Sequence, residues 1–96
     1  MHIQSGSLTI VIPGFNCSKT VGRCIDSIYY LKSIISKIIY IDDSSTDNSV
    51  DIARDRLFSI QIDFEIIQNK KRLGPSFSRN CGIKRCRTSH IMFLDS

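Results

Sequence analysis

The stretch Ile38–Asp47 reads IIYIDDSSTD, an apolar run that ends in two adjacent carboxylates and several small hydroxyl residues. Its first four residues are β-branched or aromatic, which favours a strand buried on both faces of a sheet. Two acids directly after such a strand are typical of a surface turn, of a helix start, or of a site that binds a nucleotide or a metal. The surrounding sequence has to decide among these three interpretations.

Strands and helices are expected to alternate on both sides of this stretch. Pro13 and Gly14 are expected to end the first strand, Ser18 to cap the first helix, and Asp47 or Ser45 to cap the second. The expected strands are 8–12, 38–41, 60–67 and 90–94, and the expected helices are 18–32, 47–57 and 76–86. This β-α-β-α-β-α-β order predicts an α/β fold with a mostly parallel sheet covered by helices on both faces.

The composition is that of one globular domain or a part of one. The chain has 96 residues, of which 42% are hydrophobic, and this size is near the lower end for domains. Residues 1–7 do not resemble a signal peptide, and the apolar runs are far shorter than the roughly 20 residues of a membrane span. We therefore expect a cytoplasmic protein with reduced cysteines, whose spacing fits no zinc motif.

Basic residues outnumber acidic ones by 13 to 9, and seven of the thirteen lie between Lys70 and Arg87. Such a cluster is typical of an anionic partner, whether phosphate, nucleic acid or a membrane face, and equally of a solvated helix face. We expect no nucleic-acid partner, because no recognition motif or aromatic platform accompanies the basic residues.

Polar residues follow each of the four expected strands. The carboxyl ends of parallel strands meet along one edge of the sheet, where ligands of such folds bind. Two of these strand ends are acidic, at Asp42-Asp43 and at Asp95, which favours a functional site over a simple helix start. The segments expected at this edge are Pro13–Asn16, Asp42–Ser45, Gln68-Asn69 and Asp95-Ser96.

Two common phosphate-binding motifs are absent from the sequence. The first strand is followed by PGFNCSK, which matches neither the G-x-G-x-x-G dinucleotide motif nor the G-K-[ST] of a Walker loop. A diphosphate would therefore have to be bound by a metal, by basic side chains, or by both. Asp95 offers a hard oxygen ligand of the kind that divalent cations prefer.

Four stretches together resemble the start of a family 2 glycosyltransferase of the GT-A fold. Their order and spacing match the nucleotide-sugar-binding half of that family, and the resemblance extends from Leu8 to Ser96. It implies a Rossmann-like sheet, with residues 1–96 as the N-terminal part of a longer domain, truncated inside the D-x-D motif. The stretches are VIPGFN at 11–16, IDDSSTDNSV at 41–50, LGPSFSRNCGI at 73–83 and IMFLDS at 91–96.

The resemblance also implies roles for individual residues. Phe15 stands in the base-pocket loop where Tyr is usual, Asp43 matches the acid that binds the base, and Asp42 is expected to be structural. Asp95 matches the first Asp of D-x-D, near ribose and metal, whose principal metal ligand would be residue 97. The residues expected to bind the nucleotide-sugar are Pro13, Gly14, Phe15, Asn16, Asp42, Asp43, Gly74, Arg79 and Asp95.

Some positions depart from the family pattern. Gly14 replaces the more usual Thr or Ser, and Ser44 stands where Gly is common. The run Lys70–Arg72 precedes the loop glycine and either contacts the diphosphate or faces water, and we favour water.

The activity implied by the resemblance is inverting transfer of a sugar from a nucleotide diphosphate, first of all UDP, to an acceptor hydroxyl. The acceptor would be a glycan or a lipid-linked molecule, which is compatible with peripheral association at the inner face of the membrane. A divalent cation, Mn²⁺ or Mg²⁺, would neutralise the leaving diphosphate. The general base is expected outside the chain, so no catalytic residue is assigned and the isolated chain is expected to be inactive.

The sequence leaves two other interpretations. The first is a non-catalytic nucleotide-binding or degenerate fragment. The second is a signalling receiver-like domain, which is disfavoured because its acidic pair would be expected after the first strand, where this chain has PGFN.

Overall fold

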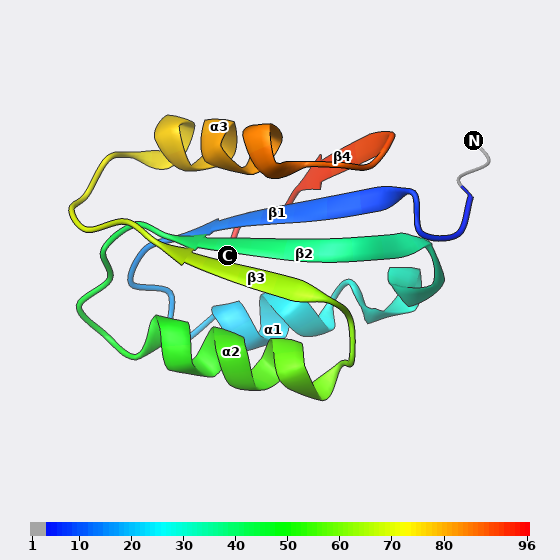
Figure 1. Cartoon of the computed structure of the whole chain (residues 1–96). Helices are drawn as coiled ribbons and strands as arrows, with labels where there is room; N and C mark the ends of the chain where they lie inside the picture. Colours follow the sequence, from blue (N-terminus) through cyan, green and yellow to red (C-terminus); the bar gives the residue numbers. More distant parts are fainter. Residues whose placement is uncertain (1–3) are drawn as a thin grey trace.

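A four-stranded, fully parallel sheet forms the middle layer of the computed structural model, which describes residues 4–96. The strand order is β3-β2-β1-β4, so that β1 and β2 are central and β3 and β4 lie at the edges (Figure 1). The strands are β1 (Leu8–Gly14), β2 (Ile35–Asp42), β3 (Phe64–Gln68) and β4 (His90–Phe93).

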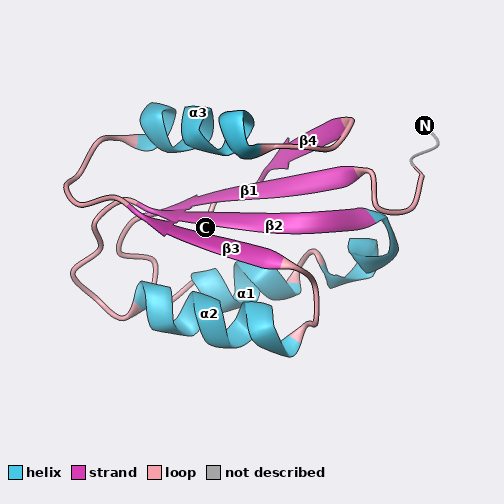
Figure 2. Cartoon of the chain, in the orientation of Figure 1, coloured by secondary structure: helices cyan, strands magenta, loops and turns pink. Residues whose placement is uncertain are grey.

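Helices cover both faces of this sheet, as the alternation in the sequence predicts. On one face lie α1 (Val21–Asp26), the 3₁₀ helix η1 (Tyr29–Ile34) and α2 (Ser49–Ser59), and on the other lies α3 (Pro75–Arg85) (Figure 2). The expected α/β fold is confirmed. Within residues 4–96, no helix combines the length and the apolar character that crossing a membrane requires.

The two faces of the central strands fill two separate cores. Side chains alternate along a strand, so Ile10, Ile12 and Tyr40 pack toward α1 and α2, whereas Val11 and Ile39 pack toward α3. All five are fully buried. The core on the α3 side is the smaller of the two.

Gly82 explains how α3 approaches β1 so closely. A Cβ atom added at Gly82 would lie 2.4 Å from Cγ1 of Val11, a distance that real contacts do not reach. Glycine normally weakens the middle of a helix by about 1 kcal/mol relative to alanine. Here it is required by packing, which also holds the start of α3 next to the carboxyl ends of the strands.

The helix expected over 18–32 is wrong in length. The α-helix ends at Asp26, and η1 follows and places Leu31 and Ile34 against the core. Ser18 does not cap α1, whose N-cap residue is Thr20 without a side-chain hydrogen bond. Tertiary packing therefore decides where the helix ends, and the strand β2 begins three residues earlier than the expected Ile38.

The first strand continues through Pro13 and Gly14, contrary to the expectation that these residues end it. The pairing of β1 with β4 stops at Val11 and Phe93, so no strand carbonyl lies opposite the Pro13 nitrogen. The missing N–H of proline therefore costs no ladder hydrogen bond. The Pro13 carbonyl, on the same side, accepts a hydrogen bond from Oγ of Ser96 at 3.0 Å.

The remaining elements differ from expectation only at their ends. The N-cap of α2 is Asn48 rather than Asp47 or Ser45, although Oδ1 of Asp47 accepts the N–H of Ser49 at 3.0 Å. The strand β3 begins at Phe64 because residues 60–63 form a turn, in which Gln61 has a φ of 58°.

Candidate functional site

The loops that follow the four strands meet at the carboxyl edge of the sheet and enclose a pocket of about 200 Å³. Five of the residues singled out in the sequence line it, namely Pro13, Gly14, Phe15, Asp43 and Asp95. The other lining residues are Arg72, Pro75, Ser78 and Ser96. The pocket thus combines an aromatic ring, two carboxylates and a guanidinium at the edge where ligands bind in such sheets.

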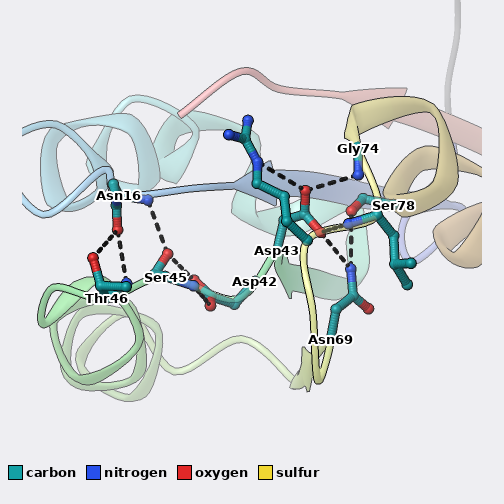
Figure 3. Close-up of polar contacts among 10 residues, drawn as sticks. Asn16, Asp42, Asp43, Ser45, Thr46, Asn69, Gly74 and Ser78 are labelled. Carbon is teal, nitrogen blue, oxygen red and sulfur yellow. Dashed lines mark hydrogen bonds and ion pairs between the residues drawn. The ribbon is translucent and has the colours of Figure 1, made fainter.

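Asp43 is the most strongly held carboxylate of the site. The residue is 4% exposed, and its Oδ1 accepts the N–H of Leu73 at 2.8 Å and the amide of Asn69 at 3.0 Å. Its Oδ2 accepts the N–H of Gly74 at 2.9 Å (Figure 3). Gly74 reaches this position with a φ of 95°, in the region that favours glycine.

The ionisation of Asp43 follows from these contacts. Burial alone would raise the pKa of its carboxyl group, but the hydrogen bonds from Leu73, Asn69 and Gly74 and the charge of Arg72 lower that pKa below its ordinary value. Asp43 is therefore a carboxylate at neutral pH, with one face directed into the pocket.

Asp42 points away from the pocket and holds the turn that follows β2. Its carboxylate accepts hydrogen bonds from the Tyr40 hydroxyl at 3.1 Å, from the Ser45 N–H at 2.8 Å and from the Ser45 hydroxyl at 2.6 Å. The residue is 2% exposed. These neighbours leave Asp42 no free direction toward a ligand.

Asn16 joins the first loop to the second. Its N–H donates to Oγ of Ser45 at 2.8 Å, and its side-chain oxygen accepts the N–H of Thr46 at 2.8 Å (Figure 3). Asn16 has a φ of 47°, a left-handed conformation that asparagine tolerates better than most residues. Asn16 thereby positions the preceding Phe15, although it does not line the pocket itself.

Arg72 contacts two residues of the pocket, unlike the other two residues of the basic run 70–72. Its guanidinium carbon lies 3.6 Å from the centroid of the Phe15 ring, and its Nε lies 3.6 Å from Oδ2 of Asp43. The Arg72 side chain is 58% exposed, as expected for this run, but an aromatic face and a buried carboxylate also attract its guanidinium to the pocket. Lys70 and Lys71 are exposed.

Asp95 is the one sequence-predicted metal ligand, and its side chain is 89% exposed at the pocket. Its Oδ1 lies 3.6 Å from Nη2 of Arg79, so two residues expected at the nucleotide form an ion pair. No group of three or more His, Cys, Asp or Glu side chains gathers within residues 4–96. Asp95 therefore fits a divalent cation as a single hard oxygen ligand and forms no complete cage.

Sequence reasoning missed three contributors to the site. Asn69 falls on the expected binding edge but carried no assigned role, and Arg72 was set aside as part of a solvated run. Ser78 is fully buried in the first half of α3, 3.5 Å from the Asn69 amide nitrogen. No pattern in the sequence distinguishes Ser78 from the neighbouring serines.

Known proteins resemble this chain over almost its whole length. The family model for glycosyl transferase family 2 matches residues 9–96. The UDP-Glc:α-D-GlcNAc-diphosphoundecaprenol β-1,3-glucosyltransferase WfaP of Escherichia coli is 34% identical over 89 residues, which cover 93% of this chain and 34% of that enzyme. The chain thus spans about a third of the length of WfaP, and it spans 12% of another curated relative, glycosyltransferase GlyA of Streptococcus pneumoniae.

Solved structures share the fold at lower identity. TarS of S. aureus in complex with UDP superposes with a TM-score of 0.82 at 20% identity, over 94% of this chain and 27% of that one. Glucosyl-3-phosphoglycerate synthase of Mycobacterium tuberculosis was solved in complex with Mn²⁺, UDP and phosphoglyceric acid. It superposes with a TM-score of 0.75 at 20% identity, over 94% of this chain and 32% of that one. The GT-A, Rossmann-like fold is thereby confirmed. With a family model that extends over almost its whole length, the chain belongs to glycosyl transferase family 2.

Proposed function

We propose that residues 4–96 bind the nucleotide diphosphate sugar of a glycosyltransferase, with UDP as the nucleotide. Phe15 receives one face of the base, and Oδ2 of Asp43 accepts an N–H from its edge. Gly74 and Asn69 hold Asp43 in place, and Pro13, Gly14 and Asn16 shape the loop that carries Phe15. Asp95 and Arg79 face the ribose and diphosphate.

The observation that carries this proposal is the juxtaposition of Phe15, Asp43 and Asp95 around one pocket. An aromatic face beside a buried, ionised acceptor is suited to a planar base that carries an N–H donor. The structural relatives support the choice of nucleotide, because TarS was solved with UDP and with UDP-GlcNAc.

In the full-length enzyme, we expect transfer of the sugar to an acceptor hydroxyl with inversion, on a glycan or a lipid-linked acceptor. Asp95 would be one ligand of Mn²⁺ or Mg²⁺, which, when bound, neutralises the charge of the leaving diphosphate. Two structural relatives were solved with Mn²⁺. The enzyme would work in the cytoplasm, and at the inner face of the membrane when its acceptor is a lipid.

The proposal is tested by titrating the chain with UDP, ADP and CMP in the presence of Mn²⁺ and following binding by calorimetry or NMR. We expect UDP to bind more tightly than either of the others, with shifts concentrated at Phe15, Asp43 and Gly74. Equal affinity for all three nucleotides, or shifts confined to the opposite end of the sheet, would contradict the donor site.

Catalysis is tested separately. We expect the 96-residue chain to show little or no sugar transfer or hydrolysis with UDP-sugars and Mn²⁺, because no described residue is placed as a general base for an acceptor. Turnover comparable to that of a full-length relative would contradict this expectation. Nucleotide binding without turnover in the full-length protein would instead support a non-catalytic nucleotide-binding role.

A further inference from the structure

Arg72 lines the pocket but has no role in the proposed donor site. Arg72 is 58% exposed, yet its guanidinium lies over the ring of Phe15 and faces Oδ2 of Asp43. These are the two groups to which the proposed function assigns the stacking and the hydrogen bonding of the base. Arg72 and the base therefore require the same place.

The Asp43 carboxylate has room for only one more hydrogen-bond donor on Oδ2. Oδ1 already accepts two hydrogen bonds, from Leu73 and Asn69, and Oδ2 accepts one from Gly74. Each carboxylate oxygen accepts about two hydrogen bonds, so a single position on Oδ2 remains. Nε of Arg72 faces Oδ2 from 3.6 Å, which is an ion pair but too long for a hydrogen bond.

A guanidinium resembles one edge of a nucleobase in the properties that matter here. It is planar and delocalised, it packs flat on an aromatic ring, and it presents N–H donors in its own plane to a carboxylate. A base that entered the pocket would make both interactions in its place. Arg72 would then lose the aromatic face and the carboxylate in the same step.

We infer that Arg72 occupies the base position in the unliganded protein and thereby makes the site select a nucleoside diphosphate over a nucleoside. A nucleoside displaces the guanidinium and offers it no new partner. A diphosphate offers two oxygens in the geometry that arginine binds bidentately. This inference rests on the proposed function, because it assumes that a base enters between Phe15 and Asp43.

The experiment compares the dissociation constants of uridine and UDP for the wild-type chain and for Arg72→Ala. Lys70→Ala is the matched control, since it removes the same charge from the same loop at an exposed position. We expect Arg72→Ala to bind uridine roughly 2- to 5-fold more tightly, the equivalent of one exposed cation–π contact. UDP affinity should not rise by the same factor, so the ratio of the uridine to the UDP constant falls.

The control variant Lys70→Ala should leave the ratio of the uridine to the UDP dissociation constant unchanged. Weaker binding of uridine to Arg72→Ala would overturn the inference, because Arg72 would then contact the base directly. Failure of the wild type and of Arg72→Ala to bind either ligand would overturn the donor site itself, and the inference with it.

A second measurement does not depend on the variants. The ring current of Phe15 should shift the side-chain NMR signals of Arg72 upfield in the free protein, and saturating uridine or UDP should remove this shift. An upfield shift that persists at saturation would show that Arg72 stays on the ring while the base is bound, and would overturn the inference.

Discussion

Asp43, directly after β2, and Glu65, on the neighbouring strand β3, are each faced by an arginine, yet they lie in very different surroundings. The Asp43 carboxylate is 5% exposed and is held mainly by backbone N–H groups of one loop. The Glu65 carboxylate, near the start of β3, is 25% exposed and meets only the long side chains of Arg85 and Lys37. Because its donors are rigid and the group is buried, the contacts of Asp43 stabilise the fold and fix the position of its carboxylate. The contacts of Glu65 form an ion cluster at the surface.

The largest expected effect is that of Asp43→Ala. Removal of the carboxylate leaves the N–H groups of Leu73 and Gly74 without their acceptor, which should cost about 2–3 kcal/mol of unfolding free energy. In the full-length enzyme, UDP binding should weaken by about 1–3 kcal/mol through loss of a charge-assisted hydrogen bond. Urea unfolding and calorimetry measure the two effects.

The matched variant is Asp43→Asn, which keeps an acceptor oxygen but removes the charge. It should recover part of the stability and less of the UDP affinity. An unchanged UDP affinity in Asp43→Ala would refute the base-binding role, and the contrast with Glu65 would then be one of stability alone.

The second prediction concerns the packing of α3 on β1, which places the two ends of this helix near Asp43 and Glu65. Gly82→Ala places a Cβ against Val11, and the overpacking should cost about 1–2 kcal/mol after the gain in helix propensity. Urea unfolding measures this loss. The double variant with Val11→Ala should be destabilised by less than the sum of the two single changes, because the smaller side chain makes room. Simple additivity would contradict the close contact.

Asp43 should also make the stability of the fold depend on pH. The folded-state pKa of Asp43 lies below its ordinary value of 3.8, so the unfolded chain binds the proton more readily. The stabilisation from Asp43 is fully present above that value and is lost as the pH falls through the lowered folded-state pKa. Acid unfolding should therefore be shallower in Asp43→Asn than in the wild type, and parallel curves would contradict this.

The smallest expected effect is that of Glu65→Gln. The hydrogen bonds from Arg85 lower the pKa of Glu65, as does the charge of Lys37, although burial opposes them. Because the cluster is partly exposed and made of flexible side chains, its loss should change the unfolding free energy by less than about 1 kcal/mol. The difference should shrink further in 1 M salt. A loss of unfolding free energy as large as that of Asp43→Ala would show that the contacts of the two acids stabilise the fold equally.

The sequence predicts the sheet and its binding edge because these depend on local patterns. Buried parallel strands such as Ile38–Ile41 are continuous apolar runs, and the position of Asp43 after such a run places it at the carboxyl edge. The break after Asp26 could not be predicted in this way, since the pattern of apolar residues through Leu31 suits one long helix as well as it suits α1 followed by η1.

The contacts of the site depend on tertiary structure, which is why they were not predicted. The family resemblance separates Asp43 from Asp42, but it does not indicate that the loop 69–74 supplies the N–H donors that hold Asp43. Arg72 lies in a run of three basic residues, and nothing in that run indicates that one guanidinium reaches Phe15. Gly82 lowered the expectation of a helix there, whereas in the structure it is what lets α3 lie on β1.

The central position of β1 has a consequence for the order of folding. One edge of β1 pairs with β2 and the other pairs with β4. Leu8 on β1 therefore pairs with His90, which is 82 positions later in the sequence. Contacts so distant in sequence form slowly, and parallel pairing adds to the delay. A ribosome makes β1 well before its second neighbour, β4. Until β4 has been made, one of the most apolar strands of the molecule therefore has an open edge, the condition under which nascent chains depend on chaperones.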